Sequence, residues 1–109
     1  MQSYRLLSVN VSNQKSLDDF LDKQSIKYPF NYEYSANDAL KLDNHSYDDI
    51  VAILFLSGYA IITIYGEDIH CHAGTYIEIM PGITHNLDIK SYIKTVKFFR
   101  KNSSRVAKY

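Results

Sequence analysis

The stretch GTYIEIMPGITH, residues 74–85, decides the fold of this 109-residue chain. Gly74 permits a tight turn, because glycine reaches backbone angles that other residues avoid. The dipeptide Pro81-Gly82 predicts a second turn, since proline presets one backbone angle and glycine permits the reversal. His85 then opens a strand whose alternation also includes Leu87, so we expect the imidazole to point toward the apolar interior.

The segments on either side of this stretch resemble short strands. Turn signals recur roughly every 7 to 12 residues, and no helix is predicted beyond the first quarter of the chain. We expect strand breaks at Gly58 and Lys90-Ser91, a hairpin turn at Gly66-Glu67-Asp68 and a turn at Asn44-His45-Ser46. This pattern is typical of an antiparallel sandwich or barrel. The predicted strands cover residues 4–11, 30–34, 40–42, 49–57, 59–65, 69–72, 76–80, 86–89 and 92–99.

One short helix is expected near the N-terminus, from Leu17 to Lys23. Asn13 or Ser16 is the expected N-cap, and two carboxylates would follow in the first turn, where the helix dipole favours them. An apolar stripe with helical spacing would lie on the sheet. These carboxylates are Asp18 and Asp19, and the stripe consists of Leu17, Phe20 and Leu21.

Residues 45–89 resemble the two sequence motifs of the cupin family. The second motif is glycine, five residues, proline, any residue, glycine, two residues and histidine. Met80 stands at the proline position with Pro81 directly after it, and Ile89 replaces the asparagine that ends the motif. The resemblance implies an all-β fold, a cupin-type antiparallel β-barrel or jelly roll, with a site inside the barrel. The residues in register with the motif are Gly74, Gly82 and His85.

The first motif is less complete. Counting back from Gly58 places its first histidine at His45, but Tyr47 and Val51 stand where the family has a second histidine and a glutamate. The opening glycine is also missing. The resemblance implies a metal held by three histidines and one glutamate, and this chain keeps only His45 and His85 of those four ligands.

A carboxylate near His45 could complete a different metal site. With a strand period of two, Asp49 shares the face of His45, so His45, Asp49 and His85 would form a two-histidine, one-carboxylate set. Such a set suits iron(II) or manganese, with nickel and zinc as further candidates. A bulge could bring Asp48 inward instead. Tyr47 would either hydrogen-bond a ligand in the pocket or fill the space of a metal.

Simpler explanations of the two histidines stay open. His45 would be solvated if its predicted turn lies on the surface. His85 would be a buried histidine whose imidazole is satisfied by a tyrosine hydroxyl or a backbone carbonyl.

Cys71 is the only cysteine, so no internal disulfide can form. If Cys71 faces the core with Ile69, strand alternation turns His70 and His72 outward, toward solvent or a partner subunit. We therefore expect these two histidines not to bind metal, and Cys71 to be a small core residue without nucleophilic activity.

The charge composition argues against nucleic acid and membrane partners, because 12 basic residues balance 12 acidic ones. The apolar run 50–56 is too short to cross a bilayer, and the N-terminus lacks a signal-peptide pattern. We expect a soluble cytoplasmic protein with a single domain over residues 1–109. Basic residues gather from Lys90 onward, and residues from about 100 to 109 are expected to form a basic tail.

The strand predicted for residues 59–65 carries little charge on either face. A small barrel cannot bury both faces of such a strand by itself. The N-terminal helix would cover part of the apolar surface, and a homodimer would cover the rest.

Three functions fit this chain. The favoured one is a small cupin that binds a small polar metabolite inside the barrel. The alternative is a metal-dependent isomerase, lyase or dioxygenase that uses His45, Asp49 and His85. The third is an effector-sensing or structural subunit, because apolar side chains could fill the barrel. The expected inward set is Val51, Ile53, Ala60, Ile62, Ile64, Leu87 and Ile89.

Overall fold

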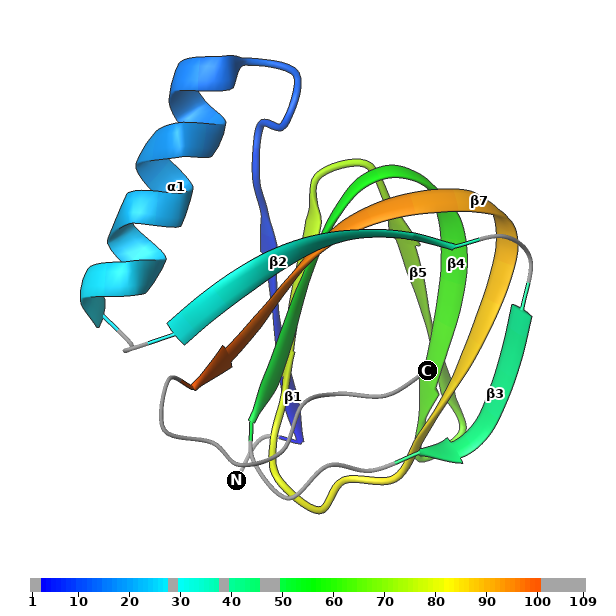
Figure 1. The fold of residues 1–109 in the computed structure, drawn as a ribbon. Helices are drawn as coiled ribbons and strands as arrows, with labels where there is room; N and C mark the ends of the chain where they lie inside the picture. Colours follow the sequence, from blue (N-terminus) through cyan, green and yellow to red (C-terminus); the bar gives the residue numbers. More distant parts are fainter. Residues whose placement is uncertain (1–2, 28–29, 38–39, 46–49, 101–109) are drawn as a thin grey trace.

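The computed structural model describes residues 3–27, 30–37, 40–45 and 50–100, with side-chain environments for 3–23 and 50–98. Figure 1 shows one helix and a set of curved strands. The elements are β1 (Tyr4–Ser8), α1 (Gln14–Lys27), β2 (Phe30–Asn37), β3 (Leu40–His45), β4 (Val51–Ile64), β5 (Glu67–His72), β6 (Thr75–Ile79) and β7 (His85–Arg100). Within these ranges no helix has the length and apolar character needed to cross a membrane.

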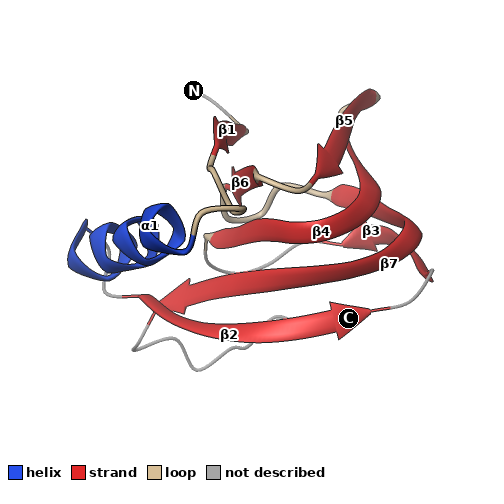
Figure 2. Ribbon diagram, turned by 90° about the horizontal axis from the view of Figure 1, so that it is seen from above, coloured by secondary structure: helices blue, strands red, loops and turns tan. Residues whose placement is uncertain are grey.

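The strands form one antiparallel sheet that curls on itself, as Figures 1 and 2 show. Its main path runs β1-β6-β4-β7-β2, with β3 added beside β7 and β5 beside β4. The first half of β4 lies between β6 and β7, and its second half lies between β5 and β7. In the same way β7 changes partner from β3 to β2. The two long strands therefore run through both halves of the sheet, and the predicted all-β fold with one helix is confirmed.

Gly58 lies inside β4, where the register between β4 and β7 shifts. Its φ is +88°, and an added Cβ would lie 2.2 Å from the carbonyl oxygen of Tyr92 and 2.7 Å from Cγ2 of Ile93. The predicted strand break at this position was wrong, because the strand passes through a bulge and continues. The bulge also changes which residues face inward, from odd-numbered residues before it to even-numbered residues after it.

Two other predicted breaks are also absent. Lys90-Ser91 lies within the continuous strand β7, and Asn44 and His45 belong to β3 instead of a turn. In both places pairing with a neighbouring strand keeps the chain extended. Ser46, the last residue of the predicted turn, lies outside the described residues.

The hairpin between β4 and β5 turns one residue earlier than predicted. Tyr65 and Gly66 both have positive φ, +50° and +79°, as a two-residue type I′ turn requires. Asp68 is already paired with Thr63 across the strands, and the hydroxyl of Thr63 donates a hydrogen bond of 2.8 Å to its carboxylate. The predicted Pro81-Gly82 turn is confirmed.

The interior of the curled sheet holds the larger of two apolar clusters. Both halves of β4 and β7 contribute to it, together with β5 and β6. All seven residues of the expected inward set belong to this cluster. Its buried members are Val51, Ile53, Phe55, Ala60, Ile62, Ile64, Ile69, Cys71, Ile77, Ile79, Leu87, Ile89 and Ile93.

The helix α1 packs against the outer face of the sheet near the start of β4 and the end of β7 (Figure 2). Leu17 and Leu21 pack there with Ala52, Leu54 and other outward residues of β4, β6 and β7. The expected contact between the helical stripe and the sheet is therefore confirmed. This cluster contains no residue of 59–65, the stretch whose two apolar faces suggested a partner subunit.

The helix begins earlier and ends later than predicted. Asn13 is its N-cap, since its side-chain oxygen accepts a hydrogen bond of 3.0 Å from the backbone N–H of Ser16. Because the first helical residue is Gln14, no acidic residue lies in the first turn. The expected position of Asp18 and Asp19 was therefore wrong. Gln14 donates to Asp18 one turn later instead, at 2.9 Å.

Candidate functional site

His85 is a buried histidine at the start of β7. It is 3% exposed and lies on the inward face with Leu87 and Ile89, as its strand position predicts. Its Nδ1 lies 3.2 Å from the carbonyl oxygen of Ile83, which can only accept a hydrogen bond. In the neutral ring the proton is then on Nδ1 and the lone pair on Nε2, the arrangement of a metal-binding or ligand-accepting imidazole.

The backbone of His45 lies directly opposite His85. His45 ends β3, and the two residues are paired in the ladder between β3 and β7, after a register shift that follows Leu42. The side chain of His45 is not among those described, and Tyr47 and Asp49 lie outside the described residues. Among the residues that are described, no three His, Cys, Asp or Glu side chains converge as a metal site would require.

A hollow opens on the inner face of the sheet. Along β7 it begins at Leu87, the inward-facing residue that follows His85. The space above it is about 280 Å³ with open solvent included, so the hollow is an open depression and not an enclosed cavity. Most of its wall is apolar, and two polar side chains of β7 also reach it. The residues that line it are Ile53, Phe55, Leu87, Ile89, Ile93, Thr95 and Lys97. His85 does not line the hollow itself but occupies the next inward position along β7.

Thr95 and Lys97 are polar residues of this hollow that sequence reasoning missed. They are 2% and 9% exposed, although Lys97 belongs to the run of basic residues that starts at Lys90. Alternation counted from His85 would have found them, because 85, 87, 89, 93, 95 and 97 share one parity and one face. The predicted break at Lys90-Ser91 prevented this alternation from being extended to residues 95 and 97.

The remaining basic residues near the C-terminus differ in position. Lys94 is exposed, and Lys90 is exposed and forms an ion pair of 2.7 Å with Asp88. Arg100 is the last residue of β7, so the predicted tail begins after it, at the earliest. Residues 101–109 lie outside the described residues.

His70 and His72 lie on the outer face of β5, as expected. Both are exposed, whereas Ile69 and Cys71 are buried between them. The Nδ1 of His70 lies 2.5 Å from the hydroxyl of Tyr59, and the two rings stack with centroids 5.9 Å apart. This pair connects β4 to β5 on the outside of the sheet, away from the hollow.

Burial raises the pKa of the Cys71 thiol from 9.0 to about 12. At pH 8 the native thiol should react with a disulfide reagent at least about a hundred-fold more slowly than the unfolded thiol, since only the thiolate attacks. The contribution of this thiol to native stability should stay constant below pH 9 and fall as the pH rises toward 12, because folding excludes the thiolate. Urea titrations across this range measure the fall, and Cys71→Ala should reduce it. Rapid labelling of the native protein would contradict the burial.

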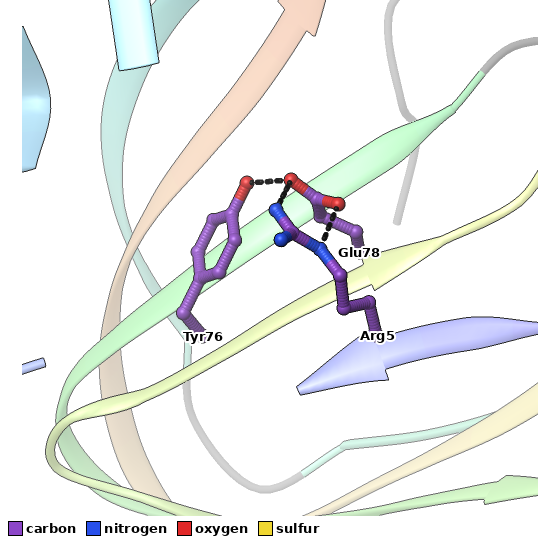
Figure 3. A network of polar contacts seen from close by, with 3 residues as sticks. All are labelled: Arg5, Tyr76 and Glu78. Carbon is purple, nitrogen blue, oxygen red and sulfur yellow. Dashed lines mark hydrogen bonds and ion pairs between the residues drawn. The ribbon is translucent and has the colours of Figure 1, made fainter. Parts of the chain in front are cut away.

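A second polar cluster lies on the outer face, between β1 and β6 (Figure 3). The Nε and Nη2 atoms of Arg5 donate to the two carboxylate oxygens of Glu78, at 2.9 and 3.0 Å. The hydroxyl of Tyr76 donates to Oε2 of Glu78 at 2.6 Å. Glu78 is 2% exposed, and the Tyr76 ring packs edge-on against Phe20 and Phe98. This cluster joins the edge strand to the sheet under the helix and does not face the hollow.

Comparison with known proteins identifies the fold. No family model matches the chain, and no curated protein matches its sequence. Solved structures match it well. Acireductone dioxygenase from Bacillus anthracis, described as having a cadmium ion in its active centre, aligns with a TM-score of 0.74 over 97% of this chain and 83% of its own, at 12% identity.

Two further matches are named for the cupin fold. A cupin superfamily protein from Desulfitobacterium hafniense has a TM-score of 0.58 over 89% of this chain and 76% of its own, at 13% identity. A cupin-2 domain protein from Shewanella frigidimarina has a TM-score of 0.60 over 75% of this chain and 92% of its own, at 17% identity. The curled antiparallel sheet and these similarities together show that the chain has the fold of a small cupin.

Proposed function

We propose that the chain binds a small polar metabolite inside the barrel. The observation that carries this proposal is the hollow on the inner face, which has apolar walls and the two polar side chains Thr95 and Lys97. Small-molecule sites have this composition, because apolar walls desolvate the ligand and a few polar groups orient it. His85 adds a buried imidazole one inward position further along β7.

Thermal unfolding with a chelator present tests this proposal. A panel of small acids, amides and sugars should contain a compound that stabilises the native state by about 1.4 kcal/mol at ten times its Kd. The melting temperature should then rise by about 5 °C. Leu87→Phe, which fills the hollow, should abolish the rise, and Lys94→Phe on the exposed face of β7 should not. If only metal ions stabilise the fold, binding of a metabolite alone is refuted.

A metal-dependent enzyme is the second candidate function. The orientation of His85, with Nδ1 directed at the carbonyl of Ile83, favours it, and so does the pairing of His45 with His85 in the ladder. His45, Asp49 and His85 would hold iron, manganese, nickel or zinc, and the bound ion would supply Lewis-acid or redox chemistry of the isomerase, lyase or dioxygenase kind. The similarity to a dioxygenase with cadmium in its active centre supports testing this alternative.

Elemental analysis of untagged protein tests the metal site. We expect one equivalent of a transition metal per chain if the site is built, and a loss of at least about ten-fold in metal affinity on His85→Ala. His72→Ala is the matched control, because that histidine is exposed on the outer face of β5. Absence of any stoichiometric metal after purification and reconstitution would refute this candidate.

We also propose that the chain acts as a homodimer in the cytoplasm. Leu6, Leu7 and Tyr65 are exposed, and Tyr59 and Ile61 on the outer face of β4 are half-buried. Sedimentation velocity at several protein concentrations measures the association. The third alternative is an effector-sensing or structural subunit. It requires that the protein bind a ligand or assemble with another chain without catalysing a reaction.

A further inference from the structure

The strand β1 lies at one edge of the sheet. Within the described ranges, β6 is the only strand that pairs with it, and Figure 2 shows β1 beside β6 at the end of the strand order. Leu6 and Leu7 of β1 are 43% and 40% exposed. An edge strand with exposed apolar side chains is a surface along which another strand can pair.

The open edge of β1 carries the backbone groups of its even-numbered residues. At one end of the ladder with β6, the backbone N–H of Val9 donates to the carbonyl of Gly74 at 2.8 Å. At the other end, the N–H of Met80 donates to the carbonyl of Ser3 at 3.0 Å. Hydrogen-bonded residues alternate in an antiparallel ladder, so the odd-numbered residues of β1 direct their backbone groups to β6. The residues whose N–H and C=O groups point away from β6 are Tyr4, Leu6 and Ser8.

The two exposed leucines lie on opposite faces of this edge. Leu6 is paired with Ile77, a member of the inner apolar cluster. Leu7 is paired with Tyr76, which belongs to the outer cluster beneath α1. A molecule docked on either face of the sheet would cover only one leucine. A strand paired along the edge would contact both, because its own side chains alternate between the same two faces.

The strand also lacks the features that usually protect an edge. Its sequence, YRLLS, contains no proline and no lysine, and its ladder with β6 runs without a register shift. Its one charged residue, Arg5, forms an ion pair with Glu78 of β6. The edge is therefore suited to pairing with a further strand.

The most complete pairing for this edge is with a second copy of the same strand. In an antiparallel pair with Leu6 on a two-fold axis, Leu6 faces its own copy, and Tyr4 faces Ser8 in both directions. These are the residues with outward backbone groups, so the whole strand pairs through about six hydrogen bonds. Leu7 then faces Arg5, and no like charges lie opposite each other. An axis one residue earlier would place Arg5 opposite its own copy, which is unfavourable.

We propose that two copies of this chain associate through β1, in an antiparallel pair centred on Leu6. This inference rests on the proposed homodimer and adds the surface and the symmetry by which the two subunits meet. The strand is short, and small interfaces give weak association. We therefore expect a Kd of about 10–100 µM.

A pair of cysteine variants tests the register. Leu6→Cys would place two thiols opposite each other, with Cα atoms about 5.5 Å apart, a separation that a disulfide spans. Leu7→Cys is the matched control, because its two thiols would lie on a diagonal of about 7–8 Å. Under mild oxidation we expect Leu6→Cys to form a covalent dimer at least about ten-fold faster than Leu7→Cys. The native Cys71 is buried and does not compete.

A pair of charge variants tests the two-fold axis at equilibrium. Leu6→Lys and Leu6→Glu should each weaken association by about ten-fold or more, since like charges then meet at the axis. An equimolar mixture of the two variants should restore association, because the facing side chains carry opposite charges. Ile61→Lys, on the outer face of β4, should have no effect. Sedimentation velocity of the full chain measures association, and melting curves show whether each variant is folded.

The possible results are distinguishable. Equal rates of disulfide formation in Leu6→Cys and Leu7→Cys would overturn the inference, since they reflect random collision. A wild-type dimer that persists in Leu6→Lys and Leu6→Glu would also overturn it and leave the proposed homodimer intact. Dissociation by Ile61→Lys would then place the interface on the outer face of β4. A wild-type chain that sediments as a monomer up to about 1 mM would overturn both the inference and the homodimer.

Discussion

Gly58→Ala should be the most destabilising single-methyl substitution in the barrel, with a loss of about 3–5 kcal/mol. Two effects add. A positive φ costs an alanine about 1–2 kcal/mol, and the new Cβ would meet the carbonyl oxygen of Tyr92 at 2.2 Å, a backbone contact that no rotamer change relieves. Because β4 and β7 both bend at this contact, relaxation would disturb the two strands that the whole sheet shares.

Thermal unfolding measures this effect as a fall of at least about 10 °C in melting temperature. The matched control is Gly66→Ala, since Gly66 has a similar φ of +79° and nothing within 4 Å of an added Cβ. This variant should lose only about 1 kcal/mol of unfolding free energy, the cost of a positive φ for alanine. If the melting temperature falls equally in the two variants, the contact between the added Cβ and the carbonyl of Tyr92 contributes nothing to the effect of Gly58→Ala.

Arg5→Met should destabilise the protein by about 2–3 kcal/mol. It removes the guanidinium that forms two hydrogen bonds to Glu78, a carboxylate that is only 2% exposed. Losing one partner of a buried pair typically costs 3–5 kcal/mol, and we expect less here because the Arg5 side chain is 33% exposed and water can replace part of it. Urea unfolding at neutral pH measures the change.

A double-mutant cycle separates the charge from the packing. Arg5→Met combined with Glu78→Gln should be more stable than Arg5→Met alone, because no charge then remains buried. Tyr76→Phe should cost about 1–2 kcal/mol, since it removes one hydrogen bond to the carboxylate and keeps the ring packing. If the double variant is no more stable than the single one, the ion pair is not what holds Glu78.

The strands next to the 74–85 stretch could be predicted because their alternation is regular. Cys71 and Ile69 are buried while His70 and His72 are exposed, and His85 is buried with Leu87, as a period of two requires. Local signals suffice there, since β5 is short and ends at a turn, and His85 and Leu87 lie at the start of β7, directly after the Pro81-Gly82 turn. The cupin resemblance rests on the same stretch and agrees with the observed fold.

The long strands could not be predicted in the same way. Gly58 and Lys90-Ser91 have the composition of breaks, yet both lie where β4 and β7 are held extended by each other. Pairing between distant segments overrides local preference in such places. The same error prevented the prediction that Lys97 faces inward. A strand expected to end at Ile89 gives no reason to continue the alternation to residue 97.

The positions of His85 and of the His45 backbone were predicted, whereas their role as ligands stays a prediction. His85 lies inside the barrel and the backbone of His45 lies opposite it, as the two motifs suggested. Sequence motifs mark ligands that a family shares, so they could not reveal Thr95 and Lys97, which belong to no motif. The metal set that includes Asp49, and the role of Tyr47, stay predictions.

A crystal structure of the full chain with a compound that raises the melting temperature tests the central claim most directly. Binding inside the barrel predicts ligand density between Ile53, Ile93 and Lys97. The same map would show a metal between His45 and His85 if one is bound. Ligand density on the outer face of the sheet, with the inner hollow filled by side chains, would contradict the account.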